Sequence, residues 1–206
     1  MTTSRFSVTT PATDLSLLTI AELRAAAGIG DASRDAQLAI IGRGVSAAIA
    51  RRCNVVSDGV NPPTLLRETC TEVFRWTGCG PLPLARRPVV EITSVTVDGT
   101  AVDAADYEID GGRYLQRLSS DALSYWADGK ITVIYVAGYQ TAPDDLKLAA
   151  TKLATATFAE SGRDPSLKRV EIPGVSLHEY WVAPSADPLL SQEVTDLLSP
   201  YVERFV

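Results

Sequence analysis

Side chains suited to acid–base or metal chemistry are few in this chain of 206 residues. His178 is the only histidine, which removes histidine-rich metal sites and most catalytic triads. It lies in a candidate strand beside Tyr180 and Trp181, where packing or an interface contact is favoured over catalysis. No nucleophile elbow, zinc-protease or phosphate-loop motif occurs. The sequence therefore predicts no catalytic residue, no cofactor and no metal ligand.

Carboxylates and thiols are the remaining candidates for ligand chemistry. Four carboxylates are grouped at one candidate hairpin, and their spacing lacks the glycine and the distal glutamate of a calcium loop: Asp103, Asp106, Glu108 and Asp110. A solvated acidic turn is favoured over a cation site. The three cysteines, Cys53, Cys70 and Cys79, match no zinc or disulfide spacing. We expect three reduced thiols.

Charge limits the kind of partner. The formal net charge of −6 opposes a protein that binds duplex DNA through a basic face. The basic pairs Arg51-Arg52 and Arg86-Arg87 are too short for a nucleic-acid stripe and suit salt bridges with a partner. No apolar run approaches the roughly 20 residues that a membrane helix needs.

The stretch 130–161 is the centre of the predicted fold. Residues 130–137 form an apolar strand that we expect to be covered on both faces. Asp144 and Asp145 place negative charge at the start of an Ala-rich helix. Two further helices are predicted upstream, and the three helices, at about 19–27, 34–53 and 143–160, should pack together. Gly42 and Gly44 in the second helix indicate close backbone packing.

Between the second and third helices the pattern changes to strands and turns. Leu66 to Trp76 alternates with many polar residues and predicts an exposed strand. Asp98-Gly99 is the strongest hairpin signal in the chain, and Asp110-Gly111-Gly112 predicts a second hairpin. A third is expected around Pro173-Gly174. The fold class is therefore α+β, a small α-helical bundle with a β-rich insertion between the second and third main helices.

Three segments carry a resemblance to a known family. They are RPVVEITSVTVDG (Arg87 to Gly99), DYEID (Asp106 to Asp110) and GKITVIYVAGYQTAPDDLKLAA (Gly129 to Ala150). In this order and spacing, over roughly Leu15 to Val206, the chain resembles the head–tail connector, or head-completion adaptor, family of long-tailed bacteriophages and gene transfer particles. The 53–88 segment is the least typical part of the connector region.

The resemblance implies a domain organisation. We expect a flexible N-terminal arm at 1–14 and a single connector domain at 15–206. The expected parts are a helical segment at 15–56, the β-rich insertion at 57–137, a helix at 141–162, a hairpin at 169–183 and a C-terminal helical tail at 187–206.

The resemblance also implies a non-enzymatic virion protein at the neck, assembled in the host cytoplasm. It would form a dodecameric ring under the portal protein, extend the DNA channel without sequence-specific binding, and dock the stopper and tail. Two alternatives remain open. One is a stopper or tail-terminator protein, usually smaller and more purely β. The other is an enzyme or ligand-binding domain that uses the β insertion.

Two sets of residues are candidates for contacts. A closed ring needs two different complementary patches on each subunit. For neighbour contacts we predict the hairpin around 170–181, the strand at 67–76 and the basic pair, with these residues in particular: Val170, Ile172, His178, Tyr180, Trp181, Arg86 and Arg87. For portal docking we predict the C-terminal apolar stripe, Leu197, Tyr201, Val202 and Phe205. Packing of that stripe on the subunit's own helices remains the alternative.

Overall fold

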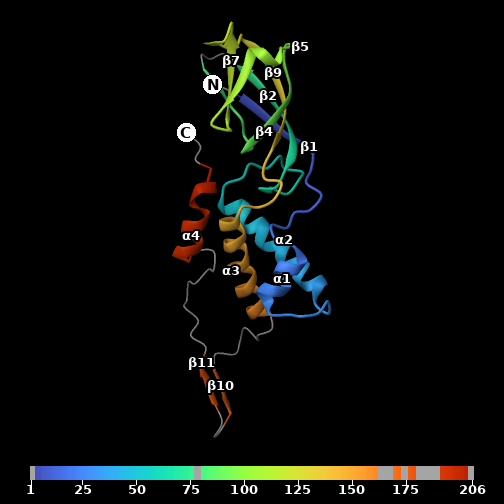
Figure 1. Cartoon of the computed structure of the whole chain (residues 1–206), viewed down its shortest axis with the longest axis vertical. Coiled ribbons are helices and arrows are strands. Elements are labelled where there is room, and N and C mark those ends of the chain that lie inside the picture. Colours follow the sequence, from blue (N-terminus) through green and yellow to red (C-terminus); the bar gives the residue numbers. More distant parts are fainter. Residues whose placement is uncertain (1–2, 77–79, 162–168, 173–175, 180–190, 204–206) are drawn as a thin grey trace. The chain divides into compact units, whose positions relative to one another are not determined.

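The computed structural model describes residues 3–76, 80–161, 169–172, 176–179 and 191–203. It confirms the α+β class, with two helices before the strands of residues 68–137 and two after them (Figure 1). The chain divides into two compact units, each built from two separate stretches of sequence. We call Met1–Leu15 with Asn54–Ala142 the β unit, and Ser16–Cys53 with Pro143–Val206 the helical unit.

The first helix of the helical unit begins and ends where the sequence predicts. Helix α1 (Ile20–Ala27) starts with a capping box, in which the Thr19 hydroxyl accepts from the Glu22 amide and the Glu22 carboxylate accepts from the Thr19 amide. Gly28 ends it in the left-handed region, with φ of 68°. Leu23 is its buried residue.

Helix α2 (Asp35–Arg52) packs closely on α1 through one of its two glycines. A Cβ atom on Gly42 would lie 2.7 Å from Leu23 Cδ1 and 2.9 Å from Ser16 Oγ. A Cβ on Gly44 would meet nothing within 4 Å. Gly42 is therefore packed closely against side chains, not against another backbone as expected, and the expectation was wrong for Gly44.

Helix α3 (Asp144–Ser161) contacts α1, α2 and the last helix, α4 (Gln192–Leu198). Its buried face is made of small and aliphatic residues, Leu146, Ala149, Ala150, Leu153 and Ala154. The predicted packing of the three main helices is therefore confirmed. The chain restarts after α4 as a short 3-10 helix, η3 (Ser199–Tyr201), with Pro200 in its first turn, as expected from the helix break before proline. No helix in the described part of the chain is long and apolar enough to cross a membrane.

The β unit contains a five-stranded antiparallel sheet in the order β1-β2-β9-β4-β5 (Figure 1). The strands are β1 (Thr3–Thr10), β2 (Glu68–Trp76), β9 (Gly129–Ala137), β4 (Val89–Val97) and β5 (Thr100–Ala101). The N-terminal segment, expected to be a flexible arm, instead forms edge strand β1. Its register with β2 runs from Thr3 opposite Arg75 to Val8 opposite Cys70.

Strand β9 is the centre of this sheet, with β2 on one side and β4 on the other. Only one of its faces is fully buried, through Ile131, Val133, Tyr135 and Ala137. The other face is half-buried, so the expectation that both faces are covered was wrong. Gly138 follows with φ of 93°, and a Cβ there would lie 2.4 Å from the Leu66 carbonyl oxygen.

A smaller sheet completes the β unit. Strand β7 (Tyr114–Ser119) pairs with β3 (Leu82–Pro83), β6 (Tyr107–Asp110) and β8 (Ala122–Ser124). A 3-10 turn, η1 (Ala104–Asp106), leads into β6. The first two predicted hairpins are present, with Asp98 and Gly99 both at positive φ. Leu82, Leu115 and Trp126 join the larger sheet's buried residues in one core.

The third predicted hairpin lies in the helical unit. Strand β10 (Arg169–Ile172) pairs with β11 (Ser176–Glu179), with Val170 opposite His178 and Ile172 opposite Ser176. Residues 173–175, which include Pro173 and Gly174, lie outside the described residues.

Candidate functional site

Strand β2 carries two carboxylates into the interior of the β unit. Glu68 is 2% exposed and Glu72 is 1% exposed, and both share the inner face with Cys70 and Phe74. The strand was predicted to be exposed because of its polar residues. That prediction was wrong, because every second residue of a strand points to the same face and here two of the inward positions are glutamates.

Arg86 is the counter-ion that allows this burial. Its Nη2 lies 2.9 Å from Glu68 Oε2, and its Nη1 donates to the Thr64 carbonyl at 2.8 Å. The guanidinium carbon lies 5.4 Å from the centre of the Phe6 ring. Arg86 is only 1% exposed, so the prediction that it contacts a neighbouring subunit was wrong.

Glu72 is held by neutral donors. It accepts a hydrogen bond from the Ala85 amide at 2.9 Å and one from the Tyr135 hydroxyl at 3.2 Å, while that hydroxyl accepts from the Arg86 amide. Burial raises the pKa values of Glu72 and Glu68 and raises that of Tyr135 well above its usual range. We call Glu68, Glu72, Arg86 and Tyr135 the buried polar cluster.

The chemistry open to the buried polar cluster is structural. Its members join β2, β9 and the 84–88 segment, and none opens to a surface where a substrate could reach it. Burial raises the pKa of both described thiols, Cys53 and Cys70, to about 11, so they stay protonated and unreactive at neutral pH. Within the described ranges, no three His, Cys, Asp or Glu side chains are grouped so as to hold a metal.

Three of the four carboxylates of the acidic hairpin bond to other groups of the same chain. Asp103 accepts from the Ala105 amide and starts η1. Asp106 pairs with Arg117 at 3.2 Å, and Asp110 accepts from Gln116 Nε2 at 3.0 Å. The carboxylates therefore point to several separate partners. Arg87, from the predicted basic pair, is half-buried and interacts within the chain.

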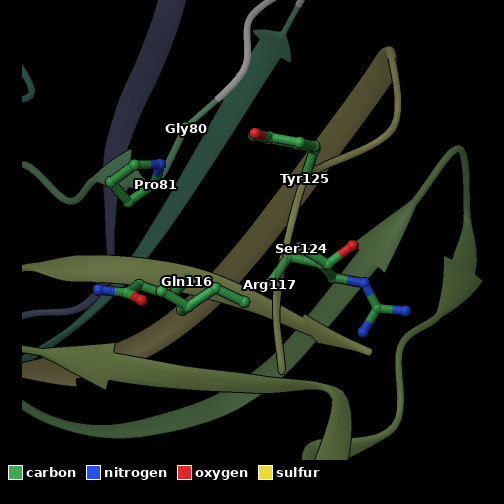
Figure 2. A pocket seen from close by; sticks show the side chains of 7 residues that line it. Gly80, Pro81, Gln116, Arg117, Ser124 and Tyr125 are labelled. Carbon is green, nitrogen blue, oxygen red and sulfur yellow. The ribbon is translucent and has the colours of Figure 1, made fainter. Parts of the chain in front are cut away.

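A half-open hollow of about 280 Å³ lies beside β7 and β8. Figure 2 shows the Tyr125 ring extending toward Gly80 and Pro81, across the hollow from Gln116. Leu123 and Tyr125 are 72% and 70% exposed. Sequence analysis did not predict this hollow, because β8 is only three residues long.

The C-terminal stripe is divided between the subunit's own core and its surface. Val194 and Leu198 of α4 are buried. Leu197, Tyr201 and Val202 are half-buried, and the Tyr201 hydroxyl donates to the Asp145 carboxylate on α3. Phe205 lies outside the described residues, and portal docking by these residues stays a prediction.

The hairpin candidates are placed only in part. Val170, Ile172 and His178 lie in the paired strands β10 and β11, whereas Tyr180 and Trp181 lie outside the described residues. Their part in contacts with neighbouring subunits also stays a prediction.

The fold of nearly the whole chain is similar to that of two solved proteins. No protein-family model and no curated protein matches the chain. One similar solved structure is a chain from the virion of a native gene transfer agent particle, with 20% identity and a TM-score of 0.61. Another comes from the neck of an empty gene transfer agent particle with C6 symmetry, with 19% identity and a TM-score of 0.59. Each match covers 98% of this chain and 96% of the other.

This chain has the fold of a particle-neck protein. The match extends over nearly the whole length of both proteins, so both the helical unit and the β unit have counterparts there. At this identity the likeness is one of fold.

Proposed function

We propose that the chain is a structural protein of a virion or virion-like particle, located in the neck as a head–tail connector. It forms a ring, dodecameric in the fully assembled neck, between the portal protein on one side and the stopper and tail on the other. Genomic DNA passes through the ring without sequence-specific contacts. The protein performs no catalysis.

One observation carries this proposal, the fold likeness over 98% of the chain to a protein from a particle neck whose structure was computed with C6 symmetry. Sixfold symmetry is compatible with a ring of twelve subunits. The buried polar cluster supports a structural role, because its ionisable groups hold strands together and reach no open surface. The net charge of −6 supports weak contact with passing DNA.

The helical unit favours a connector over a stopper or tail-terminator. Those proteins were expected to be more purely β, whereas α1, α2, α3 and α4 form a unit of their own here. An enzyme that uses the β insertion has no comparable support, since the buried charged residues described in the insertion, Glu68, Glu72 and Arg86, bond to one another or to neutral groups in the buried polar cluster.

The test is a particle preparation from cells that lack this gene. We expect heads filled with DNA but without tails, which purified protein added afterwards converts to tailed particles. Cryo-electron microscopy of the neck should then show this chain as a ring in contact with the portal. Complete tailed particles formed without the protein would overturn the proposal.

Portal docking by the C-terminus can be tested separately. The Glu203 amide donates to the Cys53 carbonyl at 2.8 Å and Glu203 is buried, so truncation after Glu203 keeps this contact and removes Phe205. We expect a folded protein with at least about tenfold weaker attachment to heads, as for loss of an aromatic anchor. Tyr201→Phe is a companion variant, because it keeps the aromatic ring in the stripe and removes the hydroxyl that donates to Asp145. Unchanged attachment of the truncated protein would show that Phe205 is not needed for docking.

A further inference from the structure

The outer face of the larger sheet carries a hollow lined by three cations. The hollow measures about 330 Å³ and is lined by Arg5, Val73, Arg75 and Lys130. Val73 and Arg75 alternate with the inward residues of β2, so they point away from the core. Arg5 lies opposite Val73 on β1, and Lys130 lies opposite Arg75 on β9. We call Arg5, Arg75 and Lys130 the basic hollow.

The positive charges of the basic hollow are not neutralised. Within the described ranges, none of the three side chains forms an ion pair or a hydrogen bond. Arg75 and Lys130 lie directly opposite each other on the neighbouring strands β2 and β9. Like charges in this arrangement destabilise a sheet. Asp98 is near, but it accepts from the backbone amide of Lys130 at 2.9 Å. An anion from outside would remove this repulsion.

The same chain presents a matching anionic strand. Strand β6 is an edge strand whose neighbour is β7. Glu108 and Asp110 are exposed and lie two residues apart, on the same face of the strand. The Asp110 carboxylate accepts one hydrogen bond, from the Gln116 side chain. The Glu108 carboxylate has no ion-pair or hydrogen-bond partner in the described part of the chain.

We infer that the basic hollow of one copy binds Glu108 and Asp110 of a second copy. Charge complementarity and number favour this partner over nucleic acid. Proteins that bind DNA through its backbone commonly make about 6–10 phosphate contacts, whereas this hollow offers three cations in a chain of net charge −6. Two carboxylates and three cations leave a small positive excess.

The contact joins two different surfaces, so each copy keeps one of each free for the next copy. Such a heterologous contact generates a ring or a filament. The inference rests on the proposed ring and names one of its subunit contacts.

Zero-length cross-linking tests the contact directly. Equal amounts of unlabelled and ¹⁵N-labelled protein are mixed at high concentration and treated with a carbodiimide, which joins amines to carboxylates in contact. We expect a cross-link of mixed isotope composition between Lys130 and Glu108 or Asp110. The Lys147–Glu22 pair, 2.7 Å apart within one chain, is the internal control and should give an unmixed cross-link. Absence of the mixed cross-link while the control forms would overturn the inference.

Charge reversal provides the second test. Arg75→Glu/Lys130→Glu and Glu108→Lys/Asp110→Lys should each reduce self-association by at least about tenfold in sedimentation velocity. An equal mixture of the two should recover it as oligomers in which the two variants alternate. If a reversed variant fails to fold by circular dichroism, Lys130→Gln and Glu108→Gln replace it. Variants that associate as wild type would contradict the contact.

Two further outcomes separate this inference from its alternatives. Loss of duplex-DNA binding in Arg75→Glu/Lys130→Glu, with self-association unchanged, would make the hollow a nucleic-acid site and overturn the inference. A normal neck ring in particles that carry this variant would also overturn the contact, while the proposed function stands. A neck of wild-type particles without any ring of this chain would instead refute the proposed function.

Discussion

Among the described residues, both units have exposed ion pairs, but only the β unit has a buried one. In the helical unit, Lys147 pairs with Glu22 and Lys152 pairs with Glu193, and the four side chains are 25–66% exposed. The buried face of α3 there consists of alanine and leucine. In the β unit, the Glu68–Arg86 pair is almost completely excluded from water. Exposed pairs contribute little to stability, whereas breaking a buried pair leaves an uncompensated charge.

This difference predicts that removal of one charge affects the β unit most. Arg86→Met leaves Glu68 buried without its counter-ion and should lower the free energy of unfolding by about 3–5 kcal/mol. The measurement is urea unfolding in a Trp181→Phe background, in which fluorescence reports Trp76 and Trp126 of the β unit. Circular dichroism at 222 nm reports the helices.

Two variants control this experiment. Arg43→Met changes an exposed arginine on α2 and should alter stability by less than about 0.5 kcal/mol. Arg86→Met/Glu68→Leu removes both charges and should recover most of the loss, because apolar replacements of a buried pair are often neutral or better. If Arg86→Met is as stable as the wild-type protein, the buried Glu68–Arg86 pair does not stabilise the fold.

The helical unit should respond instead to added volume. Gly42→Ala places a methyl group 2.7 Å from Leu23 Cδ1, and overpacking of this kind costs about 1–3 kcal/mol, more than the ~1 kcal/mol gained in helix propensity. We expect a net loss measured by the 222 nm transition. Gly44→Ala is the matched control, because its Cβ meets nothing, and it should gain up to about 1 kcal/mol. Equal effects at the two positions would contradict the packing account.

The smallest expected effect is a pH dependence whose sign for Glu22, in the helical unit, is opposite to that for Glu68 and Glu72, in the β unit. Lys147 and the Thr19 amide lower the pKa of Glu22 from 4.5 to about 2. The stability contributed by that group is present above pH 4.5 and is lost as the pH falls toward 2. Because Glu22 is partly exposed, the loss should be below about 1 kcal/mol. Glu68 and Glu72 have raised pKa values, so their contribution falls as the pH rises above 4.5.

Urea unfolding at several pH values between 2 and 7, followed with both probes, checks these signs. Glu22→Gln should remove part of the acid loss seen at 222 nm, and Glu72→Gln should reduce the decline seen by fluorescence at higher pH. If the free energy of unfolding depends on pH in the same way for both probes, the two units unfold together and their separate contributions cannot have opposite signs in this measurement.

Local patterns in the sequence predicted most of the fold. The capping box at Thr19, the turn at Asp98-Gly99 and the break before Pro200 depend on neighbouring residues alone, and all three are present in the structure. The element order from α1 to α3 followed from periodicity and from the family resemblance.

The buried polar cluster and the basic hollow were not predicted, because both are formed by residues that are distant in the sequence. Glu68 and Glu72 read as surface residues because their partners, Arg86 and Tyr135, come from other elements. The basic hollow was missed for the same reason, since Arg5, Arg75 and Lys130 meet only through the β1-β2-β9 register. Alternation in β2 was the available signal. It shows which residues share a face and does not show which face is inside.

The interleaving of the two units along the chain has a consequence for synthesis. Helices α1 and α2 leave the ribosome before the 54–142 segment, and α3, on which both pack, follows it. At about 5–20 residues per second, the two helices wait several seconds for their partner, while β1 can pair with β2 as soon as residue 76 emerges. The β unit is therefore the first to complete its fold, and nascent chains stalled with residue 142 outside the exit tunnel should resist protease in that unit while α2 is still cleaved.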